Sequence, residues 1–497
     1  MRTCLAILAI IIASASVWAT GPSSAAALGD PDTAFRNPGG EAPAFSATKS
    51  SAASPLTERL EVRLPGTEEG LRLPEPTRVA QAPGTSGPGT EAGTSTEKAA
   101  PEGLYSGSIW SRSTMTGDWG GFRNTMAEMG ITLDSDFTQI GQGVVSGGLD
   151  TGWKYQGRGQ ITLKVDTQKL GLWPGGFLTV QAEGNYGETV NATTGTLIPV
   201  NTSAIFPTAD ATQFVLPHWY FMQFFSEYVG VVLGKLDTTG GDANAFAHGK
   251  GDTQFFNMSF NFNPVTTLIV PYATLGAGVI VLPTKDPKEW IANLSVFNPT
   301  GEADDVGFNT LFASGAVIAA ETRLTTHFFD LTGHQLVGGG YSTTKYLNLD
   351  QRVRNLLIPR LPVSQHDGSW MVYYNFDQYL YQPEKTVDRG LGLFGRFGAS
   401  DGVANPLKYF YSIGLGGKGL IPSRPLDQFG VGYFYTTISK AQIPSSLGFR
   451  DTQGFEVYYN VYVTPWAQLS PDFQIVRPSQ QGVETAYVVG FRLRLVF

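Results

Sequence analysis

Cysteine is nearly missing from this chain of 497 residues, and the one present, Cys4, precedes an N-terminal apolar stretch. Arg2 followed by the apolar run Leu5–Ala15 predicts a secretory signal over residues 1–27, with cleavage after Ala19 or Ala27. Cys4 would leave with that signal. The mature chain is therefore expected to have no disulfide and no cysteine ligand for a metal.

Charge and long apolar runs are also scarce. Charged residues make up 15% of the chain, against roughly 25% in an average soluble protein. The formal net charge of -8 offers no basic excess to neutralise phosphates, so we expect no nucleic-acid partner. Beyond the signal, no run of 18 apolar residues could form a spanning helix. An exported chain with these properties is either soluble or a β-barrel.

Instead of long apolar runs, the sequence shows strict alternation of apolar and polar residues. In residues 158–166, Ile161, Leu163 and Val165 share one parity, and the other parity is polar. In the closing stretch the apolar residues share one parity and the arginines the other: Phe491, Leu493, Leu495 and Phe497 against Arg492 and Arg494. Successive side chains of a strand point to opposite faces, so such segments have one apolar and one polar face.

Sixteen alternating segments of eight to thirteen residues follow one another from Ile131 to Phe497, each ending in a turn or loop. Tyrosine and tryptophan near their ends suggest interfacial girdles, at Tyr373 with Tyr374, Tyr379 with Tyr381, and Trp466. In lipid, only a closed barrel satisfies the backbone of strands. The sequence therefore predicts an all-β fold, a transmembrane antiparallel barrel of sixteen strands over residues 131–497.

Two different segments precede the barrel. Residues 28–104 are rich in Pro, Gly, Ser and Thr with little to bury, which predicts disorder. Residues 105–130 contain a candidate short helix, with Asp118 as its cap and Gly130 as its end. This helix is expected at or in the periplasmic mouth, where it would either narrow the pore or close the barrel floor.

Several stretches resemble the OprB-type carbohydrate-selective porins of bacterial outer membranes. They are "TGDWGGFRNTMAEMGITLDSDFTQIGQGVVSGG", "KVDTQKLGLWPGGFLTVQAEGNYG", "GLFGRFGASDGVANPLKYFYSIGLGGKGLIPSRPLDQFGVGYFY" and "FEVYYNVYVTPWAQLSPDFQIVRP", in that order within residues 117–497. The resemblance implies a multi-pass outer-membrane barrel that passes small sugars by diffusion. It also implies contact with lipid and lipopolysaccharide, and a terminal Phe497 that the barrel-assembly machinery reads as a signal.

Candidate site residues follow from the polar parity, because charged side chains are costly on the lipid face. Arg158 and Glu183, on neighbouring strands, are expected to form a polar waist that binds sugar hydroxyls. The other candidates share the polar parity or the strand ends and would line the lumen: Lys164, Asp166, Glu321, Arg323, Arg396, Glu456, Arg492 and Arg494. Each could instead belong to a structural ladder of salt bridges. Trp173 is either a sugar-stacking ring or an interfacial anchor.

Other functions stay open or are disfavoured. A general or anion-preferring porin is the alternative, because arginines gather near the end of the chain. An enzyme is not expected, because none of the five histidines lies in a recognisable catalytic setting. We expect no cofactor, and Asp401 with Asn405 offers too few ligands for calcium and suggests a simple turn.

Overall fold

The computed structural model describes residues 105–207, 213–358, 360–383 and 388–497. The expected signal (1–27) and the Pro/Gly-rich segment (28–104) lie outside the described residues. The strands are β1 (Ile131–Gly148), β2 (Gly152–Asp166), β3 (Gly176–Gly187), β4 (Gln213–Phe224), β5 (Val229–Asp237), β6 (Ala273–Val281), β7 (Trp290–Phe297), β8 (Val317–Thr326), β9 (Gly333–Leu347), β10 (Gln365–Tyr381), β11 (Gly390–Ser400), β12 (Leu407–Lys418), β13 (Gln428–Ile438), β14 (Thr452–Thr464), β15 (Ala467–Arg477) and β16 (Glu484–Val496).

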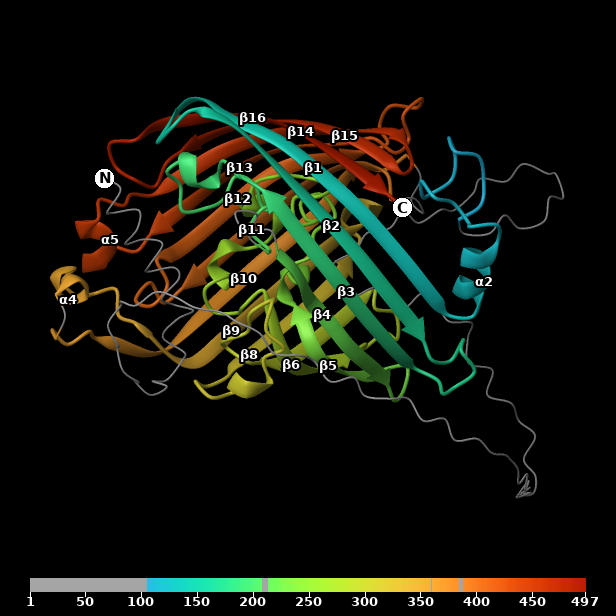
Figure 1. The fold of residues 1–497 in the computed structure, drawn as a ribbon, viewed down its shortest axis with the longest axis horizontal. Helices are drawn as coiled ribbons and strands as arrows, with labels where there is room; N and C mark the ends of the chain where they lie inside the picture. The colour runs from blue at the N-terminus through green and yellow to red at the C-terminus, as the bar shows by residue number, and fades with distance from the viewer. Residues whose placement is uncertain (1–104, 208–212, 359, 384–387) are drawn as a thin grey trace, which may run out of the picture. The chain divides into compact units, whose positions relative to one another are not determined.

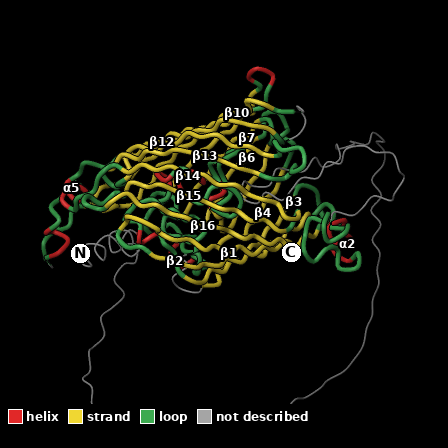
Figure 2. The backbone as a smooth tube through the Cα atoms, turned by 90° about the horizontal axis from the view of Figure 1, so that it is seen from above, coloured by secondary structure: helices red, strands yellow, loops and turns green. Residues whose placement is uncertain are grey.

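These strands form one closed antiparallel barrel in which each pairs with its chain neighbours and β1 pairs with β16 (Figures 1 and 2). The predicted class and the strand number of sixteen are confirmed, whereas β1, β2, β9 and β10 are longer than the eight to thirteen residues predicted for a segment. Closure leaves no open edge, which is the condition for strands in lipid.

Helices in the described part of the chain are short. They are α2 (Phe122–Glu128), η1 (Asn191–Thr193), η2 (Thr238–Gly240), α3 (Met258–Asn261), η3 (Pro264–Thr266), η4 (Phe308–Thr310), η5 (Phe328–Asp330), α4 (Arg354–Leu357) and α5 (Gln442–Ser446). Among these residues, none of the helices has the length and apolar character needed to cross a bilayer.

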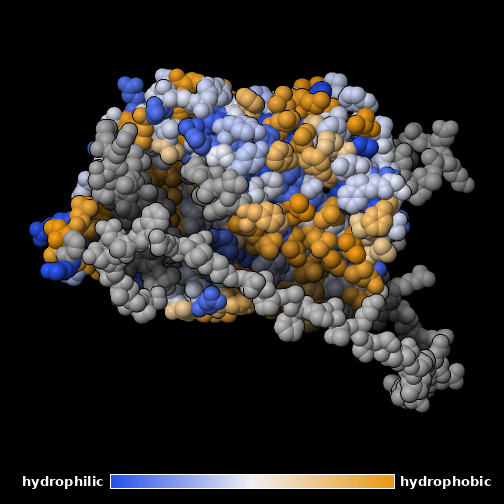
Figure 3. Space-filling model, viewed as in Figure 1, coloured by the Kyte–Doolittle hydropathy of each residue, from blue (hydrophilic) through white to orange (hydrophobic). Residues whose placement is uncertain are grey.

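The two faces of the wall divide as the alternation predicts. On β16, Phe491 is 53% exposed on the outside, whereas Arg492, its neighbour, is 1% exposed on the inside. On β2, Ile161 is exposed and Arg158 is buried. In Figure 3, apolar side chains gather over the lower right of the wall, where β2, β3 and β4 run. On these two strands the outer face is therefore apolar and the inner face polar, as lipid outside and water inside require.

The predicted tyrosine girdle is partly wrong. Tyr373 points inward, where its hydroxyl donates to Glu321 at 2.7 Å, while Tyr374 is exposed on the outside. Adjacent strand residues cannot share a face. Tyr379 is buried and Tyr381 is 56% exposed, although their spacing of two would put them on one face. A register shift between them separates their directions.

Helix α2 lies against the end of the barrel where β1 begins (Figure 1). Its expected cap is wrong: Gly121 occupies the N-cap without a side-chain bond, and Asp118 instead accepts from the Gly120 amide and Ser106. Gly130 follows the helix end at a φ of 88°, which glycine adopts without steric cost. The helix is held by Arg123, which is 1% exposed and donates to the carbonyls of Leu133 (2.6 Å) and Phe497 (3.0 Å).

The segment between β5 and β6, residues 238–272, folds into the barrel, and we call it the inner loop. Its aromatic residues pack on inward-facing side chains of the wall: Phe255 lies 5.4 Å from Phe394 and 4.7 Å from Tyr458 between ring centroids. Glycines in β13 make the space, because a Cβ added at Gly432 would lie 2.5 Å from the Phe260 ring. The lumen is therefore narrowed by a packed loop.

Candidate functional site

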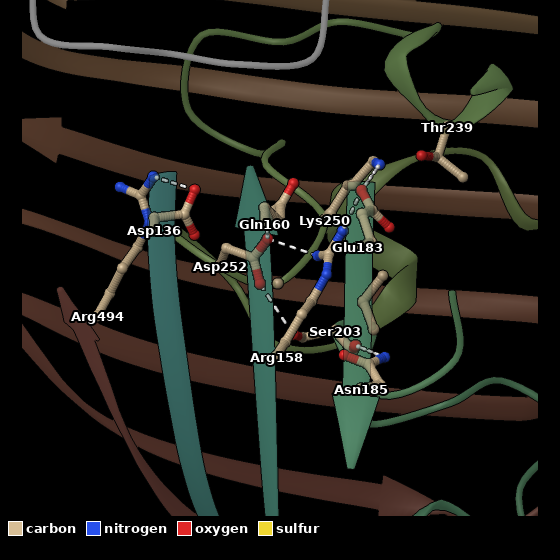
Figure 4. A network of polar contacts seen from close by, with 12 residues as sticks. Asp136, Arg158, Gln160, Glu183, Asn185, Ser203, Thr239, Lys250, Asp252 and Arg494 are labelled. Carbon is tan, nitrogen blue, oxygen red and sulfur yellow. Dashed lines mark hydrogen bonds and ion pairs between the residues drawn. The ribbon is translucent and has the colours of Figure 1, made fainter. Parts of the chain in front are cut away.

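The predicted waist pair meets the inner loop inside the barrel. Arg158 Nη2 lies 2.9 Å from Glu183 Oε1, and Arg158 Nη1 lies 2.6 Å from Asp252 Oδ2. Figure 4 shows Arg158 on β2 reaching between Glu183 of β3 and Asp252 of the loop. Lys250 of the loop pairs with Glu183 at 3.5 Å and also with Asp237. Buried charges need such partners, because an unpaired charge is strongly destabilising.

Three more of the predicted lumen residues hold the loop by its backbone. Arg396 donates to the carbonyls of Phe260 (3.1 Å) and Ala247 (2.6 Å). Arg492 donates to the Gly251 carbonyl at 2.5 Å. Glu456 accepts from two consecutive amides of the loop, those of Phe256 (2.5 Å) and Asn257 (2.9 Å). Charge-assisted bonds of this kind are roughly twice as strong as neutral ones, so the wall fixes the loop at several points.

A further anchor lies where the loop begins. Glu321 Oε2 accepts from the Asp242 amide at 3.0 Å and from the Tyr373 hydroxyl at 2.7 Å. Within the loop, His248 Nδ1 lies 3.0 Å from the Asn261 carbonyl oxygen. Burial, and then the positive charge of Arg396, lower the pKa of His248 to about 4, so its imidazole is neutral at pH 7.

The remaining predicted residues lie away from the loop contacts described above. Arg494 pairs with Asp136 at 3.4 Å along the wall. Asp166 ends β2 and accepts from the amides of the following turn, at Gln168 and Lys169. Lys164 and Arg323 are half-buried on β2 and β8. Trp173 lies in the turn between β2 and β3, where its ring nitrogen donates to Gln223 at 2.8 Å.

A cavity of about 260 Å³ lies between the inner loop and the wall formed by β4 to β8 and β10. Its lining combines aromatic rings, among them Phe206, Phe262 and Tyr272, with the polar groups of His218 and Glu321. Apart from Glu321, these residues are not among the predicted site residues. In "HWYFMQFF" both parities of the strand are aromatic or apolar, so alternation could not indicate which side faced the lumen.

A model of one family, "Carbohydrate-selective porin, OprB family", matches residues 150–497. The chain belongs to this family. Porin B of Pseudomonas aeruginosa is 23% identical over 424 residues, which cover 77% of this chain and 91% of that protein. The high-pH structure of Pseudomonas putida OprB shares the fold, with a TM-score of 0.67 and 20% identity over 79% of this chain and all of that one.

Family and barrel together place the chain in the bacterial outer membrane as a porin. The family is one of porins, and the closed barrel is the fold of a channel. Residues 398–402, Gly-Ala-Ser-Asp-Gly, have the spacing of a hydrolase nucleophile elbow. Ser400, however, ends a strand of the wall, and its Oγ donates to the Leu407 carbonyl at 2.8 Å. The hydrolase motif requires a strand that is followed directly by a helix. Here Ser400 is followed by a turn that leads to β12.

Proposed function

We propose that this porin lets small neutral sugars diffuse passively through the lumen beside the inner loop. The observation that carries the proposal is the pairing of charge at the loop. Arg158 faces Glu183 and Asp252, Lys250 faces Asp237, and Arg396 faces Asp242. Because each of these buried cations has a carboxylate partner, these three cations leave no unmatched positive charge in the narrow region. Such a region favours neutral solutes over either kind of ion.

The same pairing weighs against the anion-preferring alternative. The arginines near the end of the chain do not stand as a row of unmatched charges: Arg494 pairs with Asp136, and Arg492 lies against the loop carbonyl of Gly251 and the Ser470 hydroxyl. An anion-selective pore is typically lined by a ring of Arg or Lys that is open to the passing ion.

Liposome swelling over sugars of increasing size tests this function. Wild-type protein should pass small sugars and exclude larger ones. Arg158→Ala and Glu183→Ala each break the hold on the loop, so both should admit larger sugars than wild type does. Lys418→Ala, which removes an ion pair with Asp388 near a turn, is the control and should keep the wild-type size limit.

Two outcomes would contradict the proposal. An unchanged size limit in both variants would show that Arg158 and Glu183 do not determine the width of the constriction. A strong anion preference in a salt gradient, without any sugar flux, would favour the general porin.

Two proposals about partners accompany this function. Lipid and lipopolysaccharide would surround the apolar outer wall, because its exposed residues, such as Phe491 and Ile413, need a non-aqueous neighbour. The barrel-assembly machinery would read Phe497 before closure. Removal of Phe497 should then lower the amount of folded barrel in the outer membrane, measured by heat-dependent mobility on gels, and wild-type amounts would contradict the second proposal.

A further inference from the structure

Helix α2, at the end of the barrel where β1 begins, has apolar side chains that the barrel does not cover. We propose that α2 and the preceding residues 118–121 form an interfacial anchor, in which Trp119, Phe122 and Met129 insert into the phospholipid leaflet on the periplasmic side of the outer membrane. This role is separate from sugar permeation and does not rest on it.

The polar side of α2 attaches the helix to the wall. Arg123 is buried and donates to the carbonyl of Leu133 and to the main-chain oxygen of Phe497. Asn124 Nδ2 donates to Ser106 Oγ at 2.8 Å, within the stretch that leads into the helix. The helix is therefore held by hydrogen bonds, and these contacts leave its apolar side unused.

The apolar side of α2 is a stripe of three residues. Phe122, Met126 and Met129 are spaced at i, i+4 and i+7, which places them on one side of a helix. Phe122 is 59% exposed, Met129 is exposed and Met126 is half-buried. A surface helix of a globular protein turns such a stripe toward the core. Here the stripe faces away from the protein, so it requires an apolar neighbour other than the barrel wall.

The position of α2 fits a membrane surface. Figures 1 and 2 both show α2 beside the start of β1 and at the opposite end of the barrel from α5. Turns at the α2 end are short, such as residues 225–228 and 465–466, whereas residues 298–316 and 439–451 form longer loops at the other end. Outer-membrane barrels direct their short turns to the periplasm. The helix therefore lies at the periplasmic rim of the wall.

The stripe adjoins the lipid-facing wall through the turn between β2 and β3. The Asp166 amide, at the end of β2, donates to the Gly130 carbonyl at 2.8 Å. A Cβ added at Gly130 would lie 2.6 Å from the Lys169 Cβ, so the helix end and this turn touch. The turn exposes Leu172, Trp173 and Lys169. Apolar and aromatic side chains beside a lysine are typical of an interfacial segment, in which the cation meets lipid phosphate.

Two tryptophans near the helix extend this surface. Trp110 is 74% exposed, and Trp119 is also exposed although its φ of 53° is one that bulky residues rarely adopt. The Ile109 carbonyl accepts from Trp466 Nε1 at 2.7 Å, which ties the chain beside Trp110 to the turn between β14 and β15. Tryptophan is enriched where a membrane meets water. Exposed tryptophans at the rim of a membrane barrel therefore favour lipid as the partner of α2.

Spin labels on single cysteines test the anchor. The only cysteine of the chain, Cys4, lies in the expected signal, so Phe122→Cys would give one labelled site in the mature protein. In phospholipid vesicles, collision of the label with oxygen, which concentrates in the bilayer, would be compared with collision with a nickel chelate, which stays in water. The ratio of oxygen to nickel collisions should be severalfold higher for Phe122→Cys than for Glu128→Cys, an exposed position of α2 off the stripe. Ile413→Cys, on the outer wall, is the reference for a site in lipid.

Met129→Cys supplies a second position on the stripe if Phe122→Cys folds poorly, and it should give the same high ratio. Equal ratios at positions 122 and 128 would show that the stripe faces water and would overturn the anchor. A label at position 122 that is protected from both reagents would show that a segment of protein covers the stripe, which would also overturn it. Sugar flux into liposomes should persist in all these cases, so failure of the anchor is distinguishable from failure of the proposed porin function.

Discussion

Arg396 and Asp242 lie 2.7 Å apart between Nε and Oδ2, although 154 residues separate them in the chain. One belongs to the barrel wall and the other to the inner loop, and both side chains are almost completely buried. The loop is therefore fixed across the lumen by a contact between segments that are far apart in the chain.

Replacing Arg396 by methionine should release the loop at this point. The change leaves the Asp242 carboxylate buried and unpaired, which costs about 3–5 kcal/mol of unfolding free energy. It also removes the donors to the Phe260 and Ala247 carbonyls. We expect a higher single-channel conductance and a lower melting temperature in detergent.

Lys418→Met is the matched control, because its pair with Asp388 is partly exposed and should contribute only about 0–1 kcal/mol. Wild-type conductance in Arg396→Met would show that the loop position does not depend on this pair.

Acidification should weaken the inner loop through His248. The folded pKa of about 4 lies below the ordinary value of 6.5, so the unfolded chain binds more protons between these two values. The free energy of unfolding should therefore fall as pH drops from 6.5 toward 4. The melting temperature in detergent across this range measures the effect.

His248→Asn is the comparison for this pH effect, since its amide can still donate to the Asn261 carbonyl but cannot take up a proton. It should lose less stability than wild type over the same interval. Parallel curves for the two proteins would argue against His248 as the responsible group.

A charged residue introduced on the outer wall should lower the free energy of unfolding by an amount that depends on its depth in the bilayer. Ile413 lies at the middle of β12 and is 51% exposed, so Ile413→Arg should cost about 2–4 kcal/mol in lipid vesicles. Ile421 is similarly exposed, at 47%, but lies in the turn after β12. Ile421→Arg should cost about 0–1 kcal/mol. Denaturant unfolding in vesicles compares the two, and equal costs would mean that position 413 does not face the bilayer core.

The strands could be predicted from the sequence because their pattern is local. Each strand needs only its own alternation to show two faces, and residues 158–166, whose alternation is plain in the sequence, all lie within β2. The sequence also predicts which face of a strand is turned to the lumen, since the charged residues Arg158, Glu456 and Arg492 all face inward. What local alternation cannot give is the partner that a charge finds on the inner loop, such as Asp252 for Arg158, because that segment has no strand pattern.

The inner loop itself was beyond such reasoning. Phe255 and Phe260 show no helical or strand period, and their neighbours come from β11, β13 and β14. The incorrect prediction that Tyr379 and Tyr381 share an interfacial position has the same origin. Tyr381 faces outward because of the register shift after Tyr379, which the sequence does not reveal. Lys235 is another case: it is buried because the carbonyls of Ala303 and Asp305, on a distant loop, accept from its ammonium group.

The contact between Arg123 and the main-chain oxygen of Phe497 ties helix α2 to the residue that follows β16. A nascent barrel still missing β16 would present two unsatisfied edges, and helix α2 would lack one acceptor for the guanidinium of Arg123, which is otherwise buried. Closure of the barrel by β16 and docking of α2 are thus expected to occur together. Protease resistance of residues 105–130 should consequently report whether the circle of strands is complete.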